Sequence, residues 1–166
     1  MTDRRSFITA GLGALAALPI VQHFTAAPAL AAAPVKFAYT LTDAQWRAKL
    51  PNEAYAVLRR EATERPFSSS LNDEHRPGTF GCKGCALPLF ASTTKFDSGT
   101  GWPSFYAPLK NAVGTTTDTQ FLMERTEVHC RRCGGHLGHV FEDGPKPTGL
   151  RYCMNGAALT FTPAKA

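Results

Sequence analysis

Two pairs of cysteines, each with two residues between its members, constrain the fold of this chain most strongly. Cys82 and Cys85 form one pair, and Cys130 and Cys133 form the other, which leaves one of the five cysteines unpaired. Two-residue spacing lets both thiolates of a tight turn face one ion, and two such turns complete a tetrahedral site for zinc. Such a site is closed, so the sequence predicts one structural Zn2+. A pair of disulfides and a redox-active CxxC pair are the alternatives.

Residues 1–31 have the pattern of an export signal. A twin arginine at positions 4–5 precedes an apolar run over about residues 7–21, and an Ala-x-Ala cleavage pattern follows at 29–31. A membrane anchor is the alternative, but a span needs about 20 apolar residues and this run is shorter. We expect a cleaved twin-arginine signal and export to the periplasm. Because this route carries folded proteins, zinc would be bound before export.

The remainder of the chain is expected to fold as one domain. The 166 residues are 43% hydrophobic, which suits a single core. We expect a short linker over residues 32–40 and the domain over residues 41–164. The formal charge of +5, with a pI near 9.1, is spread along the sequence and does not indicate a nucleic-acid partner. We expect no stable membrane insertion after signal cleavage.

Helices are predicted only near the start of the domain. Thr42 and Gln45 fit a capping box, and Pro51 is expected to divide two short helices. Beyond Pro66, short apolar or alternating runs are separated by Gly, Pro, Asn and Asp, which is typical of strands and turns. The pattern predicts a mainly β, antiparallel domain with short N-terminal helices.

The fifth cysteine, Cys153, lies in the sequence LRYCMNG. In a strand, side chains alternate between faces, so Tyr152 and Met154 would share one side with Leu150, and Cys153 the other with Arg151 and Asn155. On this interpretation Cys153 does not point into the core. A nearby Arg151 would favour the thiolate and make the sulfur nucleophilic. The alternative is an inert, buried core thiol.

Two further regions contain candidate site residues. His136 and His139 lie in a glycine-rich stretch after the second CxxC pair, where either could position a thiolate or donate a proton. The alternatives are a zinc ligand or hydrogen bonding within the loop. Trp102 lies between Gly101 and Pro103 on a rigid, irregular segment, where its ring could form a pocket wall or belong to the core. Phe105, in the same motif, could extend either one, and we assign it together with Trp102 to substrate binding.

The longer motifs ERPFS, KFDSGTGWPSF and RTEVHCRRCGGHLGHVFEDGPKPTGLRYCMN resemble those of B-type methionine sulfoxide reductases. These enzymes reduce the R epimer of methionine sulfoxide, and the resemblance extends from about Leu41 to Pro163. It implies a mainly β fold of two antiparallel β-sheets in a compact barrel-like domain, with short N-terminal helices and a zinc ion held by the two CxxC turns. It also implies that Cys153 is the nucleophile. The pocket residues that it implies are Trp102, His136, His139, Arg151 and Asn155.

The resemblance predicts a thiol-dependent reduction of methionine R-sulfoxide, free or peptide-bound, with oxidised proteins as partners. Cys153 would become a sulfenic acid, and His139 or a water molecule that it holds would supply the proton. We expect no organic cofactor. The expected reductant is an external thiol: a thioredoxin-like protein, a glutaredoxin or a small thiol. We also expect a monomer. The rival functions are a non-catalytic zinc module that binds a protein partner or nucleic acid, and a thiol-disulfide oxidoreductase.

The chain departs from many family members at two positions. Thr100 occupies the place where many members have a resolving cysteine, so the usual partner for an intramolecular disulfide with Cys153 is missing. Gly156 follows Asn155 where many members have serine. The sequence alone does not predict the effect of Gly156.

Overall fold

The structure is a computed structural model that describes residues 36–119 and 124–165. The predicted signal, residues 1–31, lies outside these residues. Within them, no helix has the length and apolar character needed to cross a bilayer.

Two short α-helices begin the described part of the chain: α1 (Asp43–Lys49) and α2 (Asn52–Arg60). The predicted capping box is confirmed, because the Thr42 side chain accepts from the Gln45 amide while the Gln45 side chain accepts from the Thr42 amide. Pro51 precedes α2 and separates the two helices, as predicted. Buried residues of α2, including Val57 and Leu58, attach this helix to the core.

The described strands form two antiparallel sheets. The three-stranded sheet has the order β2-β1-β9, and the six-stranded sheet has the order β3-β4-β8-β7-β6-β5. The strands are β1 (Gly78–Cys82), β2 (Pro88–Ala91), β3 (Lys95–Phe96), β4 (Ser104–Phe105), β5 (Val113–Asp118), β6 (Arg125–Cys130), β7 (His136–Phe141), β8 (Arg151–Met154) and β9 (Leu159–Pro163). Short 3-10 helices are η1 (Ser70–Asp73), η2 (Ser92–Thr94) and η4 (Gly156–Ala158).

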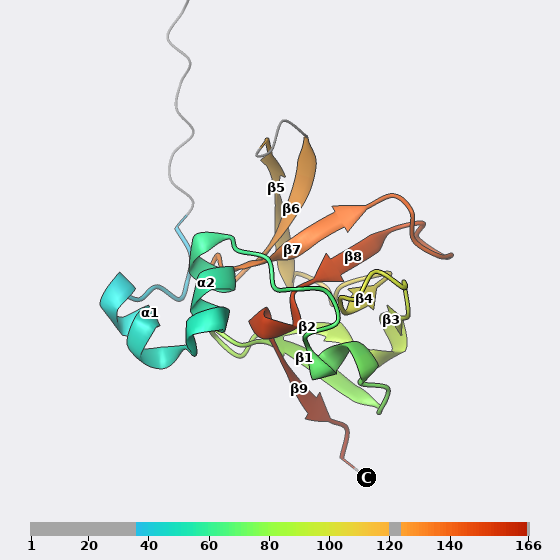
Figure 1. The fold of residues 1–166 in the computed structure, drawn as a ribbon, viewed down its shortest axis with the longest axis horizontal. Coiled ribbons are helices and arrows are strands. Elements are labelled where there is room, and N and C mark those ends of the chain that lie inside the picture. The colour runs from blue at the N-terminus through green and yellow to red at the C-terminus, as the bar shows by residue number, and fades with distance from the viewer. Residues whose placement is uncertain (1–35, 120–123, 166) are drawn as a thin grey trace, which may run out of the picture. The chain divides into compact units, whose positions relative to one another are not determined.

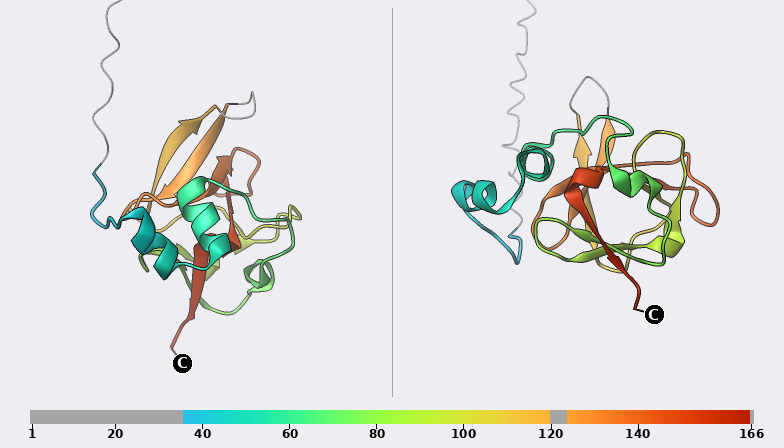
Figure 2. Two further views of the ribbon diagram at one scale, coloured as in Figure 1. Left: turned by 60° about the vertical axis from the view of Figure 1, so that its left-hand side comes forward. Right: turned by 60° about the horizontal axis from the view of Figure 1, so that its bottom comes forward.

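The predicted mainly β fold with two antiparallel sheets is confirmed, but the barrel description is too strong because neither sheet closes on itself. Figure 1 shows α1 and α2 together on one side of the domain, away from β3 and β4. The hairpin of β5 and β6 extends beyond the rest of the domain in both Figures 1 and 2. The connection that follows α2 runs across the domain toward η1 (Figure 1).

Aromatic rings join the two sheets in the core. Phe80 of β1 and Phe90 of β2 both contact Phe105 of β4, with ring centroids 5.0 Å and 4.3 Å apart. All three side chains are fully buried, so they stabilise the domain through apolar burial and ring packing. This position corrects the expectation that Phe105 binds substrate: its ring is part of the core.

The four CxxC cysteines also join the two sheets. Cys82 and Cys85 lie in the turn from β1 to β2, and Cys130 and Cys133 lie in the turn from β6 to β7. Their four sulfur atoms lie within 4.8 Å of one another, with Cys82–Cys133 at 3.7 Å and Cys85–Cys130 at 3.5 Å. A disulfide has an S–S length of about 2.0 Å, so these contacts are not disulfides.

The sulfur–sulfur distances suit a tetrahedral metal site. With metal–sulfur bonds of about 2.3 Å, the edges of a thiolate tetrahedron are roughly 3.8 Å long. The matching geometry of the two turns places the sulfurs: the Ala86 amide donates to the Cys82 carbonyl, and the Gly134 amide donates to the Cys130 carbonyl. These four cysteines could therefore hold one metal ion between the sheets.

Removing one thiolate should weaken the whole domain. We expect purified protein to contain about one metal ion per chain, and Cys82→Ser to lose the metal and several kcal/mol of unfolding free energy. A closed thiolate site contributes on the order of 10 kcal/mol when it binds its metal. Elemental analysis and thermal unfolding measure both quantities, and Cys153→Ser provides a control in which these four thiols are retained. Metal-free protein that unfolds at the same temperature as metal-loaded protein would contradict this account.

Candidate active site

Cys153 lies on β8, between β4 and β7. Antiparallel pairing places Cys153 opposite Ser104 on one side and opposite His139 on the other. Directly opposed residues in such a pair have Cβ atoms about 5 Å apart. The register of the sheet therefore brings the cysteine and one of the two predicted histidines together.

The predicted alternation along β8 is confirmed. Met154 is fully buried and Tyr152 packs against the core, whereas Cys153 is half-buried and lines a cavity. Gly138 makes this arrangement possible, because a Cβ atom at that position would meet the Cys153 carbonyl oxygen at 2.1 Å. β7 can therefore approach β8 closely beside the cysteine.

The cavity at Cys153 has a volume of about 140 Å³. It combines apolar walls with a few polar groups, the usual composition of a small-ligand site. The lining residues are Thr63, Trp102, Arg125, Gly138, His139, Phe141, Cys153 and Asn155. Trp102, His139 and Asn155 were predicted from the sequence, and the structure brings these three together with Cys153.

Trp102 is held in the cavity wall by the connection that follows α2. Its indole Nε1 donates to the Glu64 carbonyl at 3.2 Å. The Glu64 amide in turn donates to the Asn155 side-chain oxygen at 3.0 Å, and the Asn155 amide group donates to the Leu137 carbonyl at 3.1 Å. Asn155 therefore ties three segments together around the cavity.

Glu64 strengthens this connection with its carboxylate, which the sequence analysis did not identify. The carboxylate is buried and accepts from the amides of Gly156 at 2.6 Å and Ala157 at 2.7 Å. Burial raises the pKa of Glu64, and the two backbone donors oppose this effect.

Gly156 is required by close packing. A Cβ atom there would meet the Ser69 side-chain oxygen at 2.0 Å and the Ser69 Cβ at 2.4 Å. The Ser69 side chain thus fills the space that a larger residue at position 156 would need.

His139 belongs to a chain of polar contacts at the edge of the cavity. Its Nε2 atom is 2.8 Å from the Asp118 carboxylate, to which Arg125 donates at 2.6 Å. Burial lowers the pKa of His139, and the hydrogen bond with Asp118 opposes this effect. The protonated ring would therefore be a stronger acid than an exposed histidine.

His136 lies deeper, beside a different pocket. Its Nδ1 atom is 2.8 Å from the Glu127 carboxylate, and its ring centroid is 5.4 Å from that of His139. The hydrogen bond with His136 lowers the pKa of Glu127, against the effect of burial. An ionised Glu127 accepts from the Nδ1–H group of His136, and the His136 Nε2 atom has no hydrogen-bond partner among the described residues.

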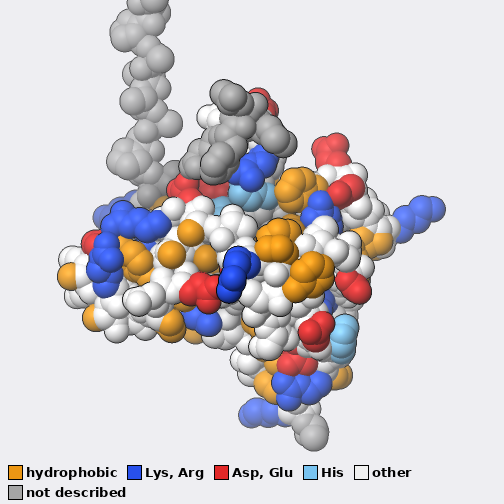
Figure 3. Space-filling model, in the orientation of Figure 1, with side chains coloured by type: hydrophobic (Ala, Val, Ile, Leu, Met, Phe, Trp, Pro, Cys, Tyr) orange, Lys and Arg blue, Asp and Glu red, His pale blue; other side chains and the backbone are white. Residues whose placement is uncertain are grey.

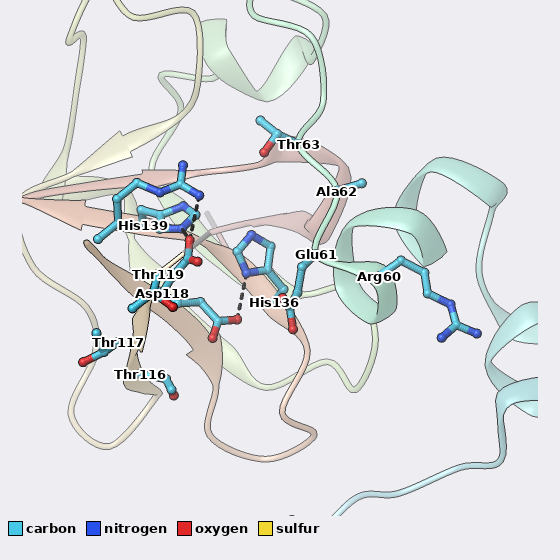
Figure 4. Close-up of a pocket in the computed structure, with 12 residues that line it drawn as sticks. Arg60, Glu61, Ala62, Thr63, Thr116, Thr117, Asp118, Thr119, His136 and His139 are labelled. Carbon is cyan, nitrogen blue, oxygen red and sulfur yellow. Dashed lines mark hydrogen bonds and ion pairs between the residues drawn. The ribbon is translucent and has the colours of Figure 1, made fainter. Parts of the chain in front are cut away.

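The pocket beside His136 is lined mainly by polar and charged residues and has a volume of about 580 Å³. Figure 4 shows Thr116 and Thr117 of β5 on one side, Ala62 and Thr63 on the other, and the two histidines between them. His139, Thr63 and Arg125 line both this pocket and the smaller cavity, so the two spaces adjoin at these residues.

Arg151 is close to Cys153 but does not line its cavity. Its guanidinium donates to both oxygens of Asp143 at 2.8 Å and 2.7 Å and lies over the Phe141 ring. These hydrogen bonds raise the pKa of Arg151, and the charge of Cys153 adds to the effect. Arg151 was predicted to favour the Cys153 thiolate through its positive charge. Because Arg151 is paired with Asp143, part of that charge is offset by the carboxylate.

Thr100 contacts the sulfur of Cys153 directly. Its hydroxyl is 3.8 Å from the sulfur and 2.8 Å from the Ser98 hydroxyl. Ser98 is 2.7 Å from the Ser104 hydroxyl, which donates to the Trp102 carbonyl at 3.1 Å. A chain of hydroxyl groups therefore leads from the cysteine to the cavity wall.

Sequence reasoning missed several residues of the site, including Glu64, Asp118, Arg125, Glu127 and Phe141. Alternation along β6 could have placed Arg125 and Glu127 on one face, and β7 alternation could have placed Phe141 with His139. Which residues of β5, β6 and β7 oppose one another depends on the register of the sheet.

Comparisons with known proteins agree with this geometry. Residues 50–163 match the SelR domain family. The chain is 58% identical over 123 residues to the peptide methionine sulfoxide reductase MsrB of Thiobacillus denitrificans, covering 74% of this chain and 93% of that protein. Identity is 55% to the protein of that name from Bradyrhizobium diazoefficiens, over 74% and 88% of the two chains. It is 50% to the one from Leptospira interrogans, over 72% and 92%. The chain belongs to the SelR domain family of peptide methionine sulfoxide reductases.

Proposed function

We propose that this protein reduces the R epimer of methionine sulfoxide in peptides and proteins, with Cys153 as the nucleophile and an external thiol as the reductant. The observation that carries the proposal is the cavity that Cys153 lines together with Trp102 and His139. The other four cysteines are gathered in the metal cluster, so Cys153 alone is available for chemistry.

The reaction balances in one oxygen transfer. The Cys153 thiolate attacks the sulfoxide sulfur and forms a sulfur–sulfur bond. The sulfur–oxygen bond then breaks, the oxygen and one proton end on Cys153 as a sulfenic acid, and the sulfur–sulfur bond breaks to release the thioether. The substrate sulfur is reduced to the thioether and the cysteine sulfur is oxidised by the same two electrons. His139, or a water molecule that it holds, supplies the proton, and its lowered pKa suits a group that must release one.

The residues that line the cavity orient the substrate. The ring of Trp102 accepts the S-methyl group, which is the apolar part of the sulfoxide. Selectivity for the R epimer rests on the family resemblance. Burial disfavours a charged His139, so positive charge near the developing oxyanion is better supplied by Arg125, which lines the cavity, and by Arg151. His136 contributes through its contact with His139, and Asn155 holds the cavity wall.

The metal in the cysteine cluster is assigned as structural Zn2+. Four buried thiolates in tetrahedral spacing favour zinc, and a closed set of four leaves no position for substrate. When bound, the ion would stabilise the fold, and it takes no part in the oxygen transfer.

The proposed setting is the periplasm. The twin arginine and the apolar run of residues 1–31 support export and cleavage of a signal, after which the mature protein would act as a monomer. Oxidised methionine residues of other proteins would be the substrates. A thioredoxin-like protein, a glutaredoxin or a small thiol would return Cys153 to the thiol.

Cys153→Ser should abolish reduction of the R-sulfoxide, because a hydroxyl of similar size is a far poorer nucleophile than a thiolate. The variant should retain its metal and its unfolding temperature, since Cys153 lies outside the cluster. Reduction is measured by chromatography of the methionine product with dithiothreitol as reductant. Substantial activity in this variant would place the chemistry at another residue.

After one turnover without reductant, Cys153 should stop at the sulfenic acid, because Thr100 replaces the usual resolving thiol and the other cysteines hold metal. Mass spectrometry of the intact chain should show one added oxygen, and dimedone should label Cys153. The loss of two hydrogens, mapped to a bridge between Cys153 and a cysteine of the cluster, would refute this prediction.

Thr100→Cys should form a disulfide with Cys153, given the 3.8 Å contact, and should favour thioredoxin-like donors over small thiols.

A further inference from the structure

Phe67 is the most exposed large hydrophobic side chain among the described residues. It is 68% exposed, and Leu109, at 36%, is the only other one classed as exposed in the described part of the chain. Most of the surface of this ring is therefore in contact with water in the folded domain. Figure 3 shows hydrophobic side chains gathered on the face toward the viewer, over the connection after α2 and over β8.

The backbone at Phe67 is strained. Phe67 has a φ of 60°, in the left-handed region that few residues other than glycine adopt readily. It occupies the third position of a turn closed by the Ser68 amide, which donates to the Arg65 carbonyl at 3.3 Å, and Pro66 occupies the second position. Turns with proline second and a positive φ third normally place glycine there. Strain of this kind commonly marks a functional position.

The strained turn is hydrogen-bonded to the segment that forms one wall of the Cys153 cavity. The Phe67 amide donates to the Gly101 carbonyl at 2.7 Å. Gly101 also has a positive φ, of 89°, and a Cβ atom there would meet the Phe67 ring at 2.8 Å. The neighbours of Gly101 are Thr100, which touches the Cys153 sulfur, and Trp102, which lines the cavity. The exposed ring therefore lies beside the site where the reaction takes place.

We propose that Phe67 is a substrate-specificity residue that binds an apolar side chain next to the oxidised methionine in a polypeptide. The inference rests on the proposed function. A cavity of about 140 Å³ holds little more than the sulfoxide side chain, so the backbone of a peptide substrate must leave over the rim. A neighbouring apolar residue can then cover the Phe67 ring and remove both surfaces from water.

The test compares two peptides that differ only beside the oxidised methionine, one with leucine and one with glycine as neighbours. Dithiothreitol is the reductant, so that no reductant protein contributes. The wild type should have the higher kcat/KM for the leucine peptide. In Phe67→Gly the ratio of the two kcat/KM values should fall about fivefold, as loss of a partly covered ring predicts. Leu109→Ala, which removes the other exposed side chain and lines none of the cavities described above, should retain the wild-type ratio.

Loss of fold cannot account for the expected result, because glycine suits the positive φ at position 67. Phe67→Gly should unfold at the wild-type temperature or above it. A lower unfolding temperature, or an unchanged ratio in an otherwise active enzyme, would overturn the inference. Another contrary result is a loss of activity in Phe67→Gly only when a thioredoxin-like protein is the reductant. That result would also overturn the inference, because it would mean that the Phe67 ring binds the reductant. Wild-type protein that reduces neither peptide would instead refute the proposed function.

Discussion

The contact on which the structure depends is the meeting of two CxxC turns. The turn between β1 and β2 carries Cys82 and Cys85 from the small sheet, and the turn between β6 and β7 carries Cys130 and Cys133 from the large one. A metal ion held by all four would join the sheets at one point, while the Phe80, Phe90 and Phe105 rings join them at another. β7 leaves the cluster and pairs with β8, so the position of Cys153 depends on this junction.

The connection after α2 also positions residues of the site. The connection after α2 crosses the end of β8 and is held there through Glu64, which binds Asn155 and the amides beyond it. The same connection receives the Trp102 indole and ends in the turn that exposes Phe67. Cys153 and His139 thus come from regular strands, whereas Trp102 comes from an irregular segment that is hydrogen-bonded to the connection after α2.

Local patterns in the sequence predicted much of this arrangement. The CxxC spacing, the capping box of Thr42 and the alternation around Cys153 each depend on neighbouring residues, and the structure confirms them. Phe105 was assigned to the pocket because it shares a motif with Trp102, but only the pairing of β4 with β8 turns its ring toward the core. Contacts such as His139 with Asp118 depend on strand register, which sequence patterns encode only weakly.

An epimer-resolved assay tests whether Cys153 reduces the R epimer of methionine sulfoxide, as proposed. Purified protein, dithiothreitol and a peptide carrying both epimers of methionine sulfoxide are incubated together, and each epimer is followed by chromatography. We expect the R epimer to be consumed to completion while the S epimer remains. Consumption of the S epimer, equal loss of both, or no loss of either would contradict it.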